Sequence, residues 1–127
     1  MQRLISILGT GLLAVAVAAC GSGTASRSSG PTASLAPDSP RIVARDNRFT
    51  TPSVTAPAKR AFAIDFDNQD SAPHNVAIYD GKGANVFRGE VFAGSGHRVY
   101  SVDALGAGSY SFKCDLHPEM TGTLVAS

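Results

Sequence analysis

Three side chains near the C-terminus could bind one metal ion together. They are the thiol of Cys114, the imidazole of His117 and the thioether of Met120, spaced three residues apart. Donors of this mixed soft and borderline kind suit copper better than the other common metals. Residues 110–113 alternate in polarity and residues 123–125 follow the group, so strands are expected on both sides. The three side chains would then lie on a short loop that can turn them toward one point.

A second imidazole must come from another part of the chain, because this loop contains one histidine. The best candidate is His74, which stands in the segment Pro73-His74-Asn75-Val76. Two histidines, one cysteine and a weak axial methionine form the ligand set of a blue-copper electron-transfer centre. Imidazole suits Cu(II), whereas thiolate and thioether suit Cu(I), so a mixed set held by the fold is a compromise that both states tolerate.

Each of these residues also has a structural interpretation when it is taken alone. Cys114 and Met120 could be buried apolar side chains, and His74 could be an ordinary histidine of the core or the surface. Zinc could also occupy a site made of two histidines and a cysteine. The third histidine, His97, follows a turn and has no ligand neighbour, so we expect an ordinary surface residue there.

The composition indicates one small domain without a strong charge. The chain has 127 residues, with 11 Lys and Arg against 10 Asp and Glu. Nothing in this balance favours nucleic acid or an electrostatically attracted membrane surface as a partner. The two cysteines, Cys20 and Cys114, each have a local explanation that is better than a disulfide between them.

The N-terminal segment is typical of an export signal. A positive start at Arg3 precedes an apolar run that ends in small residues before Cys20. The run is shorter than the roughly 20 residues of a membrane-spanning helix. The pattern resembles a bacterial lipoprotein signal, which implies that residues 1–19 are removed and that Cys20 is lipidated. An ordinary signal peptide or an uncleaved anchor, with Cys20 incidental, is the alternative.

Residues 20–40 are interpreted as the lipidated cysteine followed by a flexible linker. They are mostly Gly, Ser, Thr, Ala and Pro, and Leu35 is their one large apolar residue. Such a segment cannot bury enough surface to offset its chain entropy. A tether of about 20 residues would reach about 25 Å, or would only provide clearance from the membrane.

Residues 41–127 are predicted to form an all-β domain. Short apolar or alternating runs are separated by Gly, Pro, Asn and Asp, with no sustained helical period. Alternation of Phe62, Ile64 and Phe66 with small or acidic residues predicts a half-buried strand. Residues 74–79 are expected to form the next strand. About seven or eight such strands indicate a β-sandwich.

This domain resembles a cupredoxin in three segments: Pro73 to Val76, Tyr110 to Met120, and Gly122 to Val125. The spacing Cys-x-x-His-Pro-x-Met is most similar to the short loop of amicyanins. Plastocyanins and pseudoazurins, in the same family, have a longer gap before the methionine. The resemblance implies a Greek-key β-sandwich with one mononuclear type 1 copper near one end.

By the same resemblance, the ligands are an isolated first histidine, His74, and three loop residues, Cys114, His117 and Met120. Asn75 matches a residue around the ligands that ties the two ligand segments together. Pro118 restricts His117 to extended conformations and would stiffen the loop. The family pattern also implies that the ring edge of His117 is exposed among apolar residues.

The sequence therefore predicts a monomeric, non-enzymatic carrier of single electrons outside the cytoplasm, anchored by a lipid and meeting its redox partners transiently. Extracytoplasmic storage or delivery of copper is the alternative. Copper enzymes need further histidines, including one adjacent to the cysteine, whereas Lys113 and Asp115 flank Cys114 here. The binuclear copper centre of terminal oxidases needs two cysteines in the loop, and this loop has one.

Overall fold

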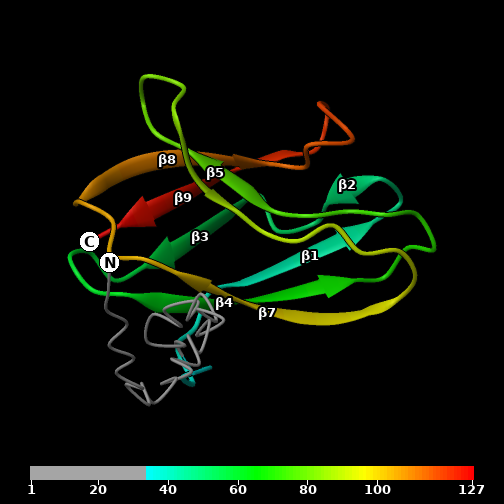
Figure 1. Ribbon diagram of the computed structural model, residues 1–127, viewed down its shortest axis with the longest axis horizontal. Helices are drawn as coiled ribbons and strands as arrows, with labels where there is room; N and C mark the ends of the chain where they lie inside the picture. The colour runs from blue at the N-terminus through cyan, green and yellow to red at the C-terminus, as the bar shows by residue number, and fades with distance from the viewer. Residues whose placement is uncertain (1–33) are drawn as a thin grey trace, which may run out of the picture.

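Two β-sheets face each other in the computed structural model, which describes residues 34–127 (Figure 1). No helix occurs in this range, so the described residues contain no helix that could cross a membrane. The described range contains nine strands: β1 (Arg41–Arg45), β2 (Arg48–Phe49), β3 (Ser53–Ala56), β4 (Phe62–Asn68), β5 (Ala77–Tyr79), β6 (Asn85–Arg88), β7 (Gly96–Val102), β8 (Gly108–Lys113) and β9 (Thr121–Ala126).

The strands form a four-stranded sheet in the order β2-β1-β4-β7 and a five-stranded sheet in the order β3-β9-β8-β5-β6. The pairs β1–β4 and β3–β9 are parallel, and the other pairs are antiparallel. The prediction of an all-β sandwich is confirmed. The strand number was predicted slightly too low, because the two-residue strand β2 is too short to produce a pattern in the sequence.

Aromatic side chains fill the space between the sheets. Phe66 of β4 stacks on Tyr100 of β7 with ring centroids 5.7 Å apart, and meets Phe49 and Phe92 edge to face. Each large apolar side chain buried in this way contributes about 1.5–3 kcal/mol to stability. Phe112 of β8 packs on Phe49 from the other sheet, with ring centroids 5.1 Å apart. This packing fixes the end of β8, which leads directly into Cys114.

The half-buried character predicted for β4 is wrong, because both faces of this strand are covered. Asp67 faces outward but is only 6% exposed. It accepts hydrogen bonds from Arg41 Nη2 and Gln69 Nε2, both at 2.8 Å, and its other oxygen lies 3.5 Å from His97 Nε2. The side chains of three neighbouring residues therefore cover the outer face of β4. His97 itself is a surface residue, with 56% of its side chain exposed.

The strand predicted for residues 74–79 is shorter in the structure, since β5 begins at Ala77. His74 leaves the sheet and forms an isolated bridge with Phe92, through N–H···O contacts of 3.1 and 3.2 Å. The carbonyl of Val76 accepts from the amide of Gly89. The backbone of His74 therefore pairs with the segment before β7, a strand of the other sheet, instead of with β8.

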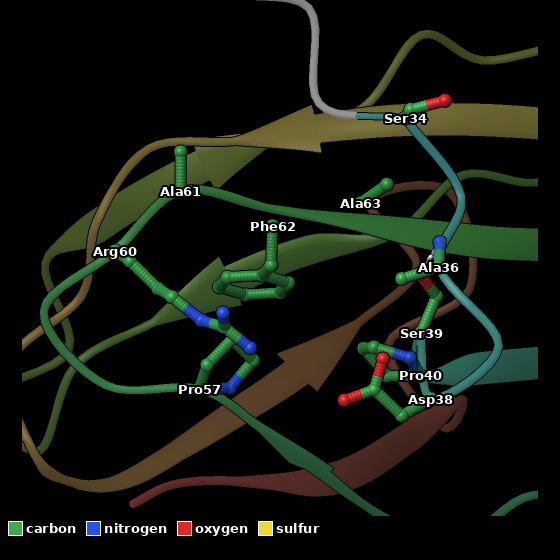
Figure 2. A pocket seen from close by; sticks show the side chains of 10 residues that line it. All are labelled: Ser34, Ala36, Asp38, Ser39, Pro40, Pro57, Arg60, Ala61, Phe62 and Ala63. Carbon is green, nitrogen blue, oxygen red and sulfur yellow. Dashed lines mark hydrogen bonds between the residues drawn. The ribbon is translucent and has the colours of Figure 1, made fainter.

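The opposite end of the sandwich receives the N-terminal segment. Residues 36–39 form a turn, and the carbonyl of Pro40 accepts from the amide of Asp65. Figure 2 shows a small pocket between residues 34–40 and the side chains of Pro57, Arg60 and Phe62. Strand β4 starts at this pocket and ends near His74. The predicted signal (1–19), Cys20 and the linker up to residue 33 lie outside the described residues.

Candidate metal centre

Three predicted ligand atoms converge at one end of the sandwich. Nδ1 of His74 lies 3.1 Å from Nδ1 of His117, and Sγ of Cys114 lies 3.8 and 3.7 Å from these two nitrogens. They form the one group of this kind found among the described residues. The loop between β8 and β9, at the upper right of Figure 1, provides Cys114 and His117, and the segment after β4 provides His74.

The size of this triangle fits a metal ion. The point equidistant from the three atoms lies about 2.1 Å from each of them, and metal bonds to imidazole nitrogen and thiolate sulfur are about 2.0–2.3 Å long. A trigonal arrangement of two histidines and one cysteine is the plane that blue-copper sites use, with a weak axial methionine. Both the spacing and the chemistry of these donors therefore suit copper.

His74 is fully buried and is held at its second nitrogen by Asp70. Nε2 of His74 lies 2.8 Å from Oδ2 of Asp70. A carboxylate at this position requires the proton on Nε2, which leaves the lone pair of Nδ1 directed toward Cys114 and His117. Metal-binding histidines commonly donate their other N–H in this way, which fixes the ring orientation.

Asp70 is in turn held by the turn between β1 and β2. The backbone amides of Asp46 and Asn47 donate to its two oxygens at 2.8 and 3.0 Å. Both turn residues have positive φ, 53° and 54°, which Asp and Asn tolerate better than most residues. Burial alone would raise the pKa of Asp70, but the amides of Asn47 and Asp46 and the His74 imidazole outweigh it and hold that pKa below its usual range.

The loop from Cys114 to Met120 is closed by its own backbone. The amide of Cys114 donates to the carbonyl of Met120 at 3.1 Å, and the amide of Met120 donates to the carbonyl of His117 at 2.9 Å. Cys114 is 1% exposed and Met120 is fully buried. Cys114 is also a free thiol. The loop thus presents one unpaired sulfur atom in apolar surroundings, with the thioether residue on the same closed turn.

His117 lies at the surface end of this group. Its ring is partly buried, and its centroid is 4.7 Å from that of His74. Its Nε2 has no hydrogen-bond partner among residues 34–127. Leu116 beside it is 49% exposed, and Pro73 and Pro118 are exposed as well. The outer edge of the His117 ring therefore lies among apolar surface residues.

Asn75 connects the two ligand segments. Its buried side chain accepts from the amide of Asp115 at 2.9 Å and donates to the Asp115 carboxylate at 2.8 Å and to the carbonyl of Gly89 at 3.1 Å. Sequence reasoning gave no role to Asp115 or to Asp70. The position of Asp70, four residues before His74, was the one available signal, and Asp115 differs from a surface aspartate only by following Cys114.

Comparison with known proteins identifies the class to which this fold and site belong. Residues 11–126 match the family described as a cupredoxin-like domain, so the chain belongs to the cupredoxin-like family. The match begins inside the segment that the sequence predicts as a signal peptide. Cupredoxins of this kind carry one type 1 copper, and the His74, Cys114, His117 and Met120 side chains fit such a copper.

Within this family, the chain is similar to amicyanin. It is 34% identical to the amicyanin of Paracoccus versutus over 79 residues, which are 61% of this chain and 57% of that protein. The crystal structure of the same amicyanin matches 73% of this chain and 85% of its own, with a TM-score of 0.55 and 28% identity. Auracyanin from Roseiflexus castenholzii, at 17% identity and a TM-score of 0.62, shares the fold over 73% of this chain and 99% of its own.

Proposed function

We propose that the protein carries single electrons on one type 1 copper bound by His74, Cys114, His117 and Met120. The observation that supports this most directly is the triangle of Nδ1, Sγ and Nδ1 atoms, whose centre lies about 2.1 Å from each donor. Membership of the cupredoxin-like family supports the same assignment. A bound copper supplies a one-electron Cu(II)/Cu(I) couple.

The proposed ligands lie in two different environments: His74 and Cys114 are buried, and His117 lies at the surface. The His74 ring is held by Asp70, and the backbone of Cys114 is held by the Met120 carbonyl. These contacts would keep both donor atoms in place in either oxidation state of the copper. A site that does not rearrange suits electron transfer, because little energy is then needed to reorganise it. The exposed apolar residues beside His117 offer a small surface on which a redox partner can dock transiently.

We also propose that the protein works outside the cytoplasm, tethered to a membrane by a lipid on Cys20. The sequence before Cys20 supports this proposal. The chain enters the folded domain at residues 34–40, beside Pro57 and Arg60, at the end opposite to the metal centre. A tether at that end would leave His117 directed away from the membrane and accessible to a partner.

Extracytoplasmic storage or delivery of copper is the second candidate. The buried triangle favours electron transfer, because a carrier that hands over its metal needs ligands that a partner can reach. Both Cys114 and His74 are almost completely buried.

The test is an absorption and electron paramagnetic resonance spectrum of the protein without its predicted signal, after addition of Cu(II). An intense blue band with narrow copper hyperfine splitting would show thiolate ligation by Cys114, and the variant Cys114→Ser should lose both features. A pale spectrum with ordinary hyperfine splitting in the wild type would contradict the proposal. Metal analysis of natively exported protein distinguishes copper from zinc.

The tether has its own test. Full-length protein is expected in the membrane fraction, labelled by a radioactive fatty acid, and Cys20→Ala should release it or leave it unlabelled. Membrane association of the Cys20→Ala variant that equals the wild type would contradict lipid anchoring without affecting the copper assignment.

A further inference from the structure

A carboxylate that no part of the proposed ligand set uses is held on the residue that follows Cys114. Asp115 follows Cys114 directly, and both of its side-chain oxygens are bound. Oδ1 accepts from the hydroxyl of Tyr79 at 3.0 Å. Oδ2 accepts from Nδ2 of Asn75 at 2.8 Å and lies 3.1 Å from Nε of Arg88. Because 23% of this side chain remains exposed, its fixed orientation comes from these partners and not from burial.

The partners of Asp115 come from three different segments. Tyr79 ends β5, Arg88 ends β6, and Asn75 follows the ligand His74. The amide of Asp115 also donates to Oδ1 of Asn75 at 2.9 Å, so these two residues are joined by two hydrogen bonds. We call Asn75, Tyr79, Arg88 and Asp115 the Asp115 clasp. It connects the edge of the five-stranded sheet to both ligand segments.

We propose that Asp115 is a positioning residue of the metal centre, which locks the His74 segment to the Cys114 segment and places a negative charge, offset by Arg88, on the residue that follows the thiolate ligand. This inference rests on the proposed function, because it concerns the same copper. It adds residues that the ligand set does not include. It also assigns them an effect on the reduction potential.

Arg88 is not placed to provide much stability. Its side chain is 61% exposed, and ion pairs of exposed side chains contribute little to folding. A charge close to a metal acts differently, because it changes the relative energies of two oxidation states that differ by one charge. The Asp115 carboxylate favours Cu(II), which is the more positive state, and the Arg88 guanidinium opposes it.

The two charges therefore predict shifts of opposite sign. The variant Asp115→Asn should raise the reduction potential, and Arg88→Gln should lower it. Both shifts should become smaller as ionic strength increases, since Arg88 is in contact with solvent. If the clasp only supported the fold, both variants would loosen the same site and move the potential in the same direction.

Matched controls separate this effect from the loss of a charge elsewhere. Arg60→Gln removes one positive charge at the end opposite to the metal centre, near the pocket of Figure 2. Asp103→Asn removes one negative charge just after β7, at the same distant end. Neither should move the potential as Arg88→Gln and Asp115→Asn do. Equal or same-sign shifts for the two clasp variants, or none, would overturn the electrostatic part of the proposal.

The positioning part is tested in the metal-free protein. The side-chain amide protons of Asn75 should exchange slowly in the wild type, faster in Asp115→Ala, and slowly again in Asp115→Asn, because asparagine can still accept from Nδ2 of Asn75. Exchange that is equally slow in Asp115→Ala would overturn it. A wild type without a blue band would reject the copper assignment instead, and these exchange rates would still decide whether the clasp joins the two segments.

Discussion

The two histidines of the metal centre have very different surroundings. His74 is fully buried, and its second nitrogen is bound to Asp70 at 2.8 Å. His117 is only partly buried, and its second nitrogen has no partner among residues 34–127. The first ring is positioned by a chain of contacts that reaches the β1–β2 turn. The second is positioned by the short loop that carries it.

This difference assigns separate roles to the two rings. A ligand held by buried hydrogen bonds keeps its orientation in either oxidation state, so the His74 side limits rearrangement. In the proposed electron carrier, a ring whose outer edge lies among exposed Leu116, Pro73 and Pro118 would offer a short path from the copper to a partner. The comparison predicts that removal of the two rings has unequal consequences.

The largest effect is expected when each imidazole is deleted. His117→Gly should lose the blue band and recover it with added imidazole, because the vacated position opens to solvent. His74→Gly should not recover, because the vacated space is closed and the Asp70 carboxylate loses its partner. Titration of both copper-loaded variants with imidazole, followed at the blue band, measures this contrast.

Two results would contradict the predicted difference between the two histidines. Equal recovery of both variants would mean that the His74 position is as accessible as that of His117. A His117→Gly spectrum that ignores added imidazole would mean that the ring edge is not exposed. The thermal stability of the metal-free variants should be measured as well, so that unfolding is not mistaken for a closed site.

The next effect concerns the base of the loop that carries His117. Gly122 in β9 is paired with Phe112 in β8, and a Cβ at Gly122 would overlap the phenylalanine ring, with Cε1 only 2.8 Å away. Gly122→Ala should therefore destabilise the protein by about 3 kcal/mol, the upper part of the usual range for overpacking. Denaturant unfolding measures this.

Gly106→Ala is the matched control, because a Cβ there would meet its nearest neighbour, the Tyr110 hydroxyl, at an ordinary 3.7 Å. Its stability should stay close to that of the wild type. If Gly122→Ala were as stable as Gly106→Ala, the fixed position of His117 would not depend on this contact.

A smaller effect is expected on the His74 side. Asp70→Ala removes a carboxylate that accepts from two backbone amides and from His74, and should cost about 2 kcal/mol, as expected for hydrogen bonds to a charged group. The same variant should broaden the copper hyperfine lines, because the His74 ring loses its fixed orientation. A variant that lost stability but kept an unchanged copper spectrum would show that Asp70 only supports the fold.

The sequence indicated the proposed ligands of this centre, but it did not indicate the residues that hold those ligands in place. Cys114, His117 and Met120 are close in sequence and have few other roles together, so their spacing alone indicated a ligand loop. Asp70 could not be recognised in the same way. Its role depends on the β1–β2 turn, about 24 residues earlier in the chain, and on backbone amides that carry no sequence signal.

The fold shows the same limit. The strand through Phe62, Ile64 and Phe66 was predicted in the right place, since its alternating pattern is local. The cover over β4 was missed because Arg41 and His97, distant in sequence, lie beside Asp67 only after the sheet has formed. The length of β5 was overestimated because the pairing of His74 with Phe92 replaces the expected strand pairing. Alternating polarity reports burial, but it does not identify which neighbour covers a face.

The smallest expected effect is the pH dependence of folding in the metal-free protein. Burial would raise the pKa of Asp70, but the amides of Asn47 and Asp46 and the His74 ring lower it overall. When the pH is lowered, Asp70 therefore binds its proton near pH 4 in the unfolded chain and only at a lower pH in the native state. The stabilisation is present above that pH and is lost as the pH falls through the native pKa.

Asp70→Asn lacks this titration, so its unfolding free energy should fall less steeply than that of the wild type between about pH 5 and pH 3. Asp67 contributes in the same direction, because hydrogen bonds from Gln69 and Arg41 outweigh its burial and lower its pKa as well. The contribution of Asp70 is therefore given by the difference in pH dependence between the wild type and Asp70→Asn, and not by the wild-type slope alone. Identical slopes would mean that the Asp70 carboxylate is held no better in the native state than in the unfolded chain, which would remove the main distinction between the two histidines.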